Sequence, residues 1–452
     1  MIALPAVGLA PDEAARRASA RPGAFWLAAP APDEVGVARD FVGAGPVRVV
    51  RGDSPGALAR VEQAWAEARA AWRAEGAPPP AGIPAAVGWF SYDLGRAFVG
   101  LPARAAAGGD GAAWPAVEMH FHDAVWVRDA GGAATIFAQD AAAARRLAER
   151  LATPAPAAAS DGLRLGALRP DHPDELFLDG VRRVLEYLRA GDAYQVNLSR
   201  RLSAACPSAS GVSGGDGATA VALAAALRAR APAPHAALIA AADGDGALVG
   251  NSPERFLAVG LDGRVETCPI KGTRSRGGTP EADRAAAAAL AAAAKDRAEH
   301  VMIVDLERND LGRVCRTGSV EVASLARVVA LPTLFHLVST VRGRLRPEVG
   351  LGALLEATFP GGSITGAPKR RAMQIIDELE PATRGPYTGA TGWLGAAGDL
   401  DLAIAIRTAI VRGGRLSLSV GGGVVADSTP EGELAETEVK ARAFAALCGA
   451  AG

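Results

Sequence analysis

The chain has 452 residues, a formal net charge of −1 and a hydrophobic fraction of 49%. This length is enough for a large buried core, and about 150 residues per domain allows up to about three domains. The near-zero charge argues against nucleic acid or an anionic membrane surface as the main partner. The four cysteines are far apart and form no metal-ligand spacing, so a reducing, cytoplasmic compartment is the simpler interpretation. The longest apolar run, residues 285–294, is too short to cross a bilayer.

Two low-complexity stretches divide the chain. Ala152–Asp161 and the Gly/Ser-rich Ser208–Thr219 have the composition of linkers or loops. The second stretch follows a predicted strand over Tyr194–Leu202. Most of the polar motifs come after the first stretch.

The clearest strand pattern lies near the C-terminus. Leu402–Val411 alternates large apolar residues with small ones and predicts a strand. Arg407 lies on the small-residue face, where it either binds an anion or reaches solvent from a sheet edge. Arg415–Val420 predicts a second strand, joined to the first by a hairpin across Gly413–Gly414.

Two helices have the same start signal. Thr279-Pro280-Glu281 combines a cap, a first-turn proline and an acidic residue, and predicts a helix that runs to about Asp305. Thr429-Pro430-Glu431 predicts a last helix that ends near Leu447. Hairpin signals outnumber βαβ units, so we expect an α+β fold with antiparallel sheets.

Carboxylates are concentrated on these two helices. Glu433 and Glu436 share one helix face, Lys440 lies one turn further on, and Glu299 lies in the other predicted helix. Carboxylates from two helices, together with substrate oxygens, could hold Mg²⁺. Spacing alone favours the alternative, a solvated acidic face paired with Lys440.

Two glycine-rich segments could bind anions through main-chain N–H groups. These are Gly421–Gly423 and Phe359–Lys369, and both are equally typical of simple turns. Neither fits a nucleotide-binding pattern. His336 lies in a strand-like run, where a hydrogen-bonded core histidine is more common than a catalyst. Residues 305–310 (DLERND) suggest a polar helix end that bonds to loops.

Lys271 lies in the short apolar segment Pro269–Thr273, just before the basic loop Arg274–Gly278. A water-exposed lysine has a pKa near about 10.4 and is protonated at neutral pH. Burial beside apolar groups or other cations lowers this pKa and frees the amine for nucleophilic attack. The segment alone favours an ordinary surface lysine.

Together these segments resemble the chorismate-utilising enzymes, and within that family the aminodeoxychorismate synthase branch. The matching segments, in order, are Gly191–Ser199, Ser252–Phe256, Pro269–Thr273, Lys295–Glu299, Val304–Arg313, His336–Thr340, Phe359–Lys369, Ile406–Thr408 and Gly421–Lys440. The resemblance implies two packed antiparallel β-sheets flanked by outer helices. It also implies that residues 1–165 are a weakly matching N-terminal part of the same folded unit, and that residues 166–452 form the chorismate-binding catalytic region.

The resemblance further implies a substrate and metal site. Glu299, Glu433 and Glu436 would hold Mg²⁺, and the ion would bind the ring carboxylate of chorismate. The residues implied for substrate binding are Arg407 and Tyr387 at the enolpyruvyl carboxylate, the N–H groups of Gly421, Gly422 and Gly423, and also Thr365, Gln195 and Lys440.

Two positions separate the branches of the family. Lys271 would add to ring C2 and expel the C4 hydroxyl, after which ammonia attacks C4 and releases the lysine as 4-amino-4-deoxychorismate forms. Anthranilate synthases resemble this chain but carry alanine at that position. Isochorismate and salicylate synthases carry lysine where this chain has Gln195. Glu254 would be the general acid/base, which requires a raised pKa, and His336 would orient the same region.

The resemblance implies a glutamine amidotransferase as a separate partner subunit that supplies the ammonia. The alternative functions are anthranilate synthase component I and a non-catalytic, chorismate-binding regulatory subunit. Lys271 argues against the first. Intact charges at Glu254, Lys271, Glu299 and Glu436 argue against the second, because a decayed site is expected to lose costly buried charges.

Overall fold

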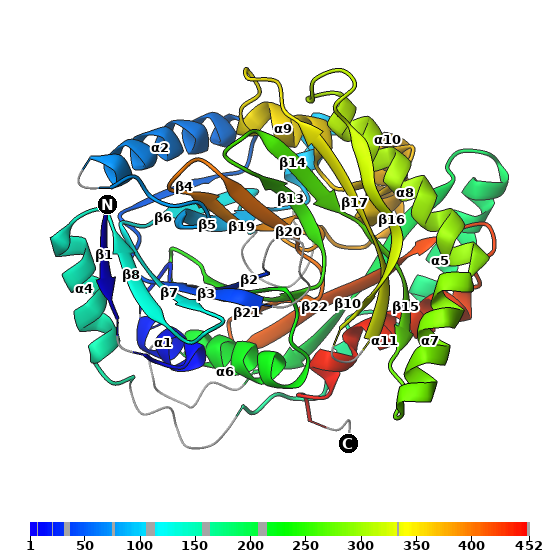
Figure 1. Ribbon diagram of the computed structural model, residues 1–452. Coiled ribbons are helices and arrows are strands. Elements are labelled where there is room, and N and C mark those ends of the chain that lie inside the picture. The colour runs from blue at the N-terminus through cyan, green and yellow to red at the C-terminus, as the bar shows by residue number, and fades with distance from the viewer. Residues whose placement is uncertain are drawn as a thin grey trace.

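The structure is a computed structural model that describes residues 1–6, 8–19, 21–30, 37–74, 77–104, 114–155, 163–206, 215–331 and 334–449. Two antiparallel sheets pack together, with helices along their outer faces (Figure 1). This arrangement confirms the predicted α+β fold. No described helix has both the length and the apolar character needed to cross a membrane.

The first sheet joins strands from both ends of the chain. In the described residues its strands, in spatial order, are β1 (Ile2–Pro5), β8 (Ala134–Ala138), β7 (Ala124–Asp129), β3 (Val37–Gly43), β2 (Phe25–Pro30), β11 (His235–Ala240), β12 (Ala247–Ser252), β21 (Thr408–Arg412), β22 (Arg415–Val424), β10 (Gln195–Ala205) and β18 (Gly366–Ala367), and β9 (Arg169–Pro170) also pairs with β10.

The second sheet also joins strands that lie far apart in the sequence. Its described strands, in spatial order, are β15 (Ile270–Ser275), β17 (Leu334–Arg344), β14 (Arg264–Cys268), β13 (Arg255–Val259), β20 (Leu400–Ile404), β19 (Ala390–Gly395), β5 (Pro84–Phe90), β6 (Val117–Phe121) and β4 (Arg48–Gly52), and β16 (Glu321–Ala330) pairs with β17. Strand β2 pairs with β11 and β5 pairs with β19, so residues 1–165 and 166–452 share both sheets. The division of function between these two regions stays a prediction.

Helices cover the outer face of each sheet. Their bounds are α1 (Pro11–Ala18), α2 (Gly56–Arg73), α3 (Leu94–Phe98), α4 (Ala141–Ala152), α5 (Asp174–Arg189), α6 (Gly215–Arg230), α7 (Pro280–Ala292), α8 (Ala294–Gly312), α9 (Leu351–Thr358), the 3₁₀ helix η1 (Gly362–Ile364), α10 (Lys369–Leu379) and α11 (Pro430–Ala445). In Figure 1, α2 and α9 lie above the second sheet, and α1 and α6 lie below the first.

Aromatic side chains fill the space between the sheets. Phe25 and Phe41 of the first sheet pack in one cluster with Trp89 and Trp393 of the second. Phe41 and Trp393 have ring centroids 6.4 Å apart. Complete burial of a side chain of phenylalanine size stabilises the fold by roughly 1.5–3 kcal/mol, so this cluster holds the two sheets together.

Several local predictions are confirmed. Thr279 accepts a hydrogen bond from the N–H of Ala282, and Thr429 accepts one from Gly432, so both residues cap their helices as predicted. The hairpin between β21 and β22 turns at Gly413 and Gly414, whose φ values are 58° and 72°. Such positive φ values favour glycine, which explains the residue type at this turn.

Two longer elements are broken where the sequence predicts continuity. The helix predicted from Pro280 to about Asp305 divides at Ala293, which has a ψ of 98° and separates α7 from α8. The strand predicted over Leu402–Val411 is also wrong, because β20 belongs to the second sheet and β21 to the first. The chain crosses between the sheets through Ile406 and Arg407, and Arg407 has a φ of 49°.

The predicted loops are described only in part. Of Ser208–Thr219, residues 208–214 lie outside the described residues, and Gly215–Thr219 forms the first part of α6 rather than a loop. Of Ala152–Asp161, residues 156–161 lie outside them as well.

Candidate active site

The candidate site forms where β15 of the second sheet meets β10 and β22 of the first. Lys271 lies on β15, Gln195 on β10 and Gly423 on β22. A Cβ atom at position 423 would lie 3.0 Å from the side-chain amide of Gln195 and 3.2 Å from Nζ of Lys271. The missing side chain of Gly423 therefore makes room for both groups.

Lys271 is half-buried in a cluster of charges. Burial and the nearby cation of Lys440 lower the pKa of Lys271, while Glu299, Glu254 and Glu436 act in the opposite direction. This is the environment that a nucleophilic amine needs, because it increases the fraction of neutral lysine. The structure thus excludes the alternative of a fully solvated lysine.

Glu254 lies between β12 and β13, and only 5% of it is exposed. Its carboxyl receives hydrogen bonds from the Ser363 side chain and the Ile270 main chain. Burial raises the pKa of Glu254, whereas the Ser363 hydrogen bond and the charge of Lys271 lower it. Because Ile270 directly precedes Lys271 in the chain, this hydrogen bond places the Glu254 carboxyl close to Lys271. A buried carboxyl with a raised pKa beside an amine is suited to general acid/base catalysis.

The predicted metal-binding carboxylates lie beside the glycine strand. A Cβ at Gly422 would lie 2.7 Å from Glu433 Oε2 and 3.3 Å from Glu436 Oε1. Glu433 is buried and its Oε1 accepts a 2.6 Å hydrogen bond from Ser428, while Oε2 is buried without a hydrogen-bond partner in the described part of the chain. Burial raises the pKa of Glu433, and the charges of Glu436 and Glu299 raise it further.

These carboxylates are suitable ligands for a hard cation, but they do not form a complete metal site. Among the described residues, no three His, Cys, Asp or Glu side chains lie close enough to hold a metal ion. Lys440 forms a 2.6 Å ion pair with Glu436 and donates a 2.7 Å hydrogen bond to the carbonyl oxygen of Gly421. The carboxylates of Glu433 and Glu436 repel each other, and Glu433 Oε2 has no hydrogen-bond partner among the described residues. Carboxylate oxygens are the ligands that Mg²⁺ prefers. The metal site stays a prediction.

Arg407 lies in the crossing between the two sheets and is half-buried. Burial lowers the pKa of Arg407, and the charge of Glu254 opposes this effect. The charge of Arg407 also acts on His336, so these three side chains belong to one electrostatic cluster. The burial of the Arg407 guanidinium argues against the solvent-facing alternative.

His336 is buried in β17, and its Nδ1 lies 3.0 Å from Thr273 Oγ1 and 3.3 Å from the carbonyl oxygen of Gly272. Burial lowers the pKa of His336 to about 4, and the charge of Arg407 acts in the same direction. His336 is therefore neutral at pH 7. Its Nε2 atom and both polar side-chain atoms of Gln195 are buried without hydrogen-bond partners in the described residues. These atoms are available to a bound molecule.

Thr365 and Tyr387 lie in segments joined by an arginine that the sequence analysis missed. Arg384 donates to the carbonyl oxygen of Ile364 and to Thr388 Oγ1, at 3.0 and 3.2 Å. Thr365 is completely buried and donates its hydroxyl hydrogen bond to the Gly361 carbonyl oxygen. Tyr387 is also buried, and the Arg384 guanidinium lies 5.8 Å from its ring centre.

Arg384 is paired with a second missed residue, Glu380. Their side chains are 2.7 Å apart and nearly inaccessible to solvent. Glu380 Oε1 also accepts hydrogen bonds from the N–H and the hydroxyl of Ser199 on β10. The spacing of four residues between opposite charges was the available signal for this pair. Nothing in the sequence points to its contact with β10.

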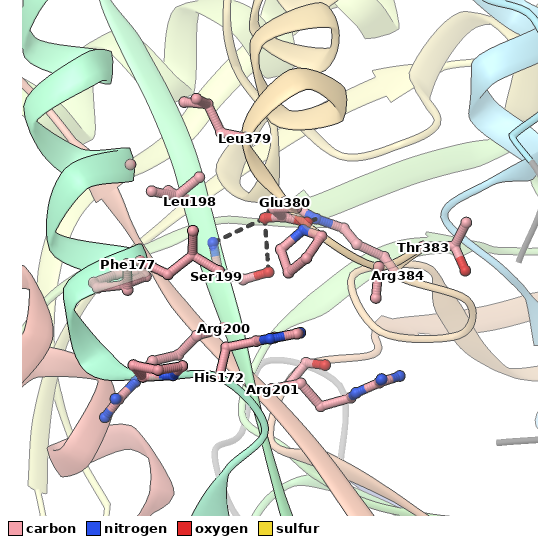
Figure 2. A pocket seen from close by; sticks show the side chains of 16 residues that line it. His172, Phe177, Leu198, Ser199, Arg200, Arg201, Leu379, Glu380, Thr383 and Arg384 are labelled. Carbon is pink, nitrogen blue, oxygen red and sulfur yellow. Dashed lines mark hydrogen bonds and ion pairs between the residues drawn. The ribbon is translucent and has the colours of Figure 1, made fainter. Parts of the chain in front are cut away.

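Two cavities, each of about 660 Å³ including its open mouth, lie near these residues. The first is lined by Phe177, Leu198 and Glu380, and Figure 2 shows the bonds from Ser199 to Glu380 at its wall. None of the predicted catalytic side chains lines it. The second cavity is lined by His336 together with His235 and Arg255, among others.

Comparison with known proteins places the chain in a family. Residues 22–446 match the family model described as chorismate binding enzyme. The chain belongs to the chorismate-binding enzyme family. The chain is 43% identical to aminodeoxychorismate synthase component 1 of Klebsiella aerogenes, over 78% of this chain and 74% of that protein. It is 40% identical to the protein of the same name from Escherichia coli K12, with the same coverage. It is also 38% identical to an anthranilate synthase component 1 of Haloarcula marismortui, over 81% of this chain and 76% of that protein.

Two solved structures share the fold of this chain. Anthranilate synthase component I of Streptococcus pneumoniae superposes with a TM-score of 0.73 at 29% identity, covering 92% of this chain and 94% of that one. The menaquinone-specific isochorismate synthase MenF of Escherichia coli gives a TM-score of 0.75 at 21% identity, covering 99% and 94%. The second likeness concerns the fold alone.

Proposed function

We propose that this member of the chorismate-binding enzyme family converts chorismate and ammonia to 4-amino-4-deoxychorismate and water. The observation that carries the proposal is the amine of Lys271, whose pKa is lowered by burial, held beside the buried carboxyl of Glu254. The relatives named aminodeoxychorismate synthase component 1 support the same assignment.

Lys271 and Glu254 divide the chemistry into two displacements. In the first, the lysine nitrogen bonds to ring C2, both ring double bonds shift by one position, and the C4–O bond breaks. Glu254 gives its proton to the departing hydroxyl, which leaves as water. In the second, ammonia bonds to C4, both double bonds shift back, and the C2–N bond breaks to return the lysine. Glu254 takes up the proton that ammonia loses, so the net reaction exchanges a hydroxyl for an amino group.

Charged groups around this pair bind the dianionic substrate. Arg407 would hold the enolpyruvyl carboxylate with Tyr387 and the N–H groups of Gly421 and Gly423, and neutral His336 would orient the reacting region. Glu299, Glu433 and Glu436 would hold Mg²⁺, which supplies positive charge for the ring carboxylate. Gln195 has no basic group to activate water, so it favours amination over hydration.

The ammonia would come from a glutamine amidotransferase subunit. The relatives carry the name component 1, which implies a second component in those enzymes. The cytoplasmic location expected from the cysteine spacing stays a prediction.

Two other activities remain as outcomes of a test. The anthranilate synthase relative from Haloarcula marismortui is only slightly less similar than the aminodeoxychorismate synthases. Lys271 decides between these branches in our proposal, because it permits attack at C2 by the protein rather than by ammonia. A regulatory subunit would bind chorismate without turning it over.

Product identification tests the proposal. The purified chain is incubated with chorismate, Mg²⁺ and ammonium at mildly alkaline pH, and the products are separated by retention and mass. We expect 4-amino-4-deoxychorismate, which an added lyase converts to 4-aminobenzoate, and we expect Lys271→Ala to lose this product. Anthranilate or isochorismate from the unmodified chain would contradict the proposal. No turnover, even with an amidotransferase partner, would favour the regulatory subunit.

A further inference from the structure

A second buried carboxyl lies behind Glu254. Glu307 belongs to α8 and is only 3% exposed. Its Oε1 accepts a 3.0 Å hydrogen bond from the N–H of Gly362, the first residue of η1. Its Oε2 is buried and has no hydrogen-bond partner among the described residues. The predicted polar helix end at residues 305–310 therefore does bond to a loop, and that loop borders the candidate site.

The Gly362–Ser363 turn connects the two carboxyls. A Cβ at Gly362 would lie 2.5 Å from Leu306 Cδ2 and 3.2 Å from Glu307 Oε1, so the turn packs closely against α8. The next residue, Ser363, is buried and hydrogen-bonds to the carboxyl of Glu254. Glu307 thus binds the turn at Gly362, and the turn binds Glu254 through Ser363.

The charges around Glu307 keep it neutral. Burial, together with the charges of Asp310 and Glu254, raises the pKa of Glu307 to about 8, although Lys369 and the Gly362 N–H act in the opposite direction. Lys369 is itself engaged in a 2.7 Å ion pair with Asp310. At pH 7 the Glu307 carboxyl is therefore protonated, and it accepts the Gly362 hydrogen bond without adding a negative charge near Glu254.

We propose that Glu307 is a positioning residue for Glu254, acting through the Gly362–Ser363 turn. This inference rests on the acid/base role proposed above for Glu254. Glu307 fixes the turn and thereby the orientation of the Glu254 carboxyl toward Lys271. Ionisation of Glu307 at alkaline pH adds an anion that raises the proton affinity of Glu254, which makes Glu254 a poorer acid for the departing C4 hydroxyl.

Two substitutions separate these effects. Glu307→Gln keeps an acceptor for the Gly362 N–H and cannot ionise, whereas Glu307→Leu removes the acceptor. With saturating ammonium, we expect Glu307→Leu to lower kcat about tenfold or more and to change KM for chorismate by less than about threefold. We expect Glu307→Gln to keep most of the activity below about pH 8.

The ratio of wild-type kcat to Glu307→Gln kcat is the decisive readout. Measured from about pH 6.5 to 9.5, this ratio should fall as the pH rises past about 8, because only the wild type gains a charge. Titration of Lys271 and of ammonia affects both proteins and cancels. Glu62→Leu is the matched control, since Glu62 of α2 accepts a 2.9 Å hydrogen bond from the Gly352 N–H of α9. We expect its kcat to be unchanged.

A constant ratio across this range, or a Glu307→Leu protein with wild-type kcat at every pH, would overturn the inference. If Glu307→Leu does not fold, the ratio obtained with Glu307→Gln decides alone. The underlying function is judged separately by Glu254→Gln: an active Glu254→Gln protein would remove the acid/base role itself. An inactive Glu254→Gln together with a fully active Glu307→Leu would reject only the role of Glu307.

Discussion

Lys271 and Gly423 lie in different sheets and face each other, since a Cβ at position 423 would be 3.2 Å from the lysine Nζ. We expect Gly423→Ala to push the amine away from its place and to crowd Gln195. Overpacking of this kind costs about 1–3 kcal/mol, so kcat should fall about tenfold while the protein stays folded. Steady-state kinetics and thermal unfolding check this. Gly278→Ala is the control, because a Cβ there meets nothing within 4 Å; equal effects of both substitutions would contradict the close contact.

Lys440 should set the pH at which Lys271 becomes reactive. The cation of Lys440 lowers the pKa of Lys271, and its ion pair with Glu436 partly neutralises a carboxylate that raises that pKa. Lys440→Met removes both effects, so the pKa of Lys271 rises. Because the proposed nucleophile is the neutral amine, the acidic limb of the kcat profile should move to higher pH.

The rate of Lys271 modification by an amine-directed reagent, followed by mass spectrometry across pH, measures the Lys440 effect without turnover. Arg442→Met on the exposed face of α11 serves as the control. If Lys440→Met does not shift the pH dependence of Lys271 modification, Lys440 does not act on the amine.

Glu436 should matter for Mg²⁺ in a way that Glu438 on the same helix does not. We expect Glu436→Gln to raise the Mg²⁺ concentration needed for half-maximal activity about tenfold or more, because a hard cation loses a charged oxygen ligand. Chelation of Mg²⁺ should abolish activity in the wild type. Glu438→Gln changes an exposed carboxylate two residues away and should leave the titration as it is. The same Mg²⁺ titration for Glu436→Gln and wild type would remove Glu436 from the metal site.

Arg384→Met tests the buried ion pair between Arg384 and Glu380. The substitution leaves Glu380 buried without its cation, which costs about 3–5 kcal/mol of the free energy of unfolding. Urea unfolding measures the change. Arg182→Met breaks exposed pairs with Glu175 and Asp179 and should cost less than about 1 kcal/mol. Similar losses for the two variants would mean that the Arg384 pair adds nothing by being buried.

Local signals in the sequence predicted the elements that depend on local chemistry. The caps at Thr279 and Thr429 and the turn at Gly413–Gly414 each involve neighbours in the chain, and all three are confirmed. The strand over Leu402–Val411 was wrong for a physical reason. The alternation of large and small residues continues across the crossing because β20 and β21 both have a buried face. Periodicity therefore cannot show that the chain changes sheets.

Contacts between distant segments were beyond the reach of sequence patterns. The resemblance to a family led to Lys271, Glu254 and Arg407, and the structure brings these three into one electrostatic cluster. Ser363, Glu380 and Arg384 were missed, because each acts through partners that lie far away in the chain. The break at Ala293 also had no signal, since alanine is the best helix former.

The register of β22 decides which glycines can offer an N–H to a substrate. Gly421 and Gly423 lie opposite Ser199 and Asn197 of β10, whose own N–H groups point away from β22, toward Glu380 and Thr365. In an antiparallel ladder such opposed residues do not bond to each other, so Gly421 and Gly423 direct their N–H groups to the other edge. The described pairing of β21 with β22 stops at Leu418. The departure of the chain toward Arg407 thus leaves two N–H donors, one strand repeat apart, beside the arginine. Gly422, with its N–H turned toward β10, contributes only the space left by its absent side chain.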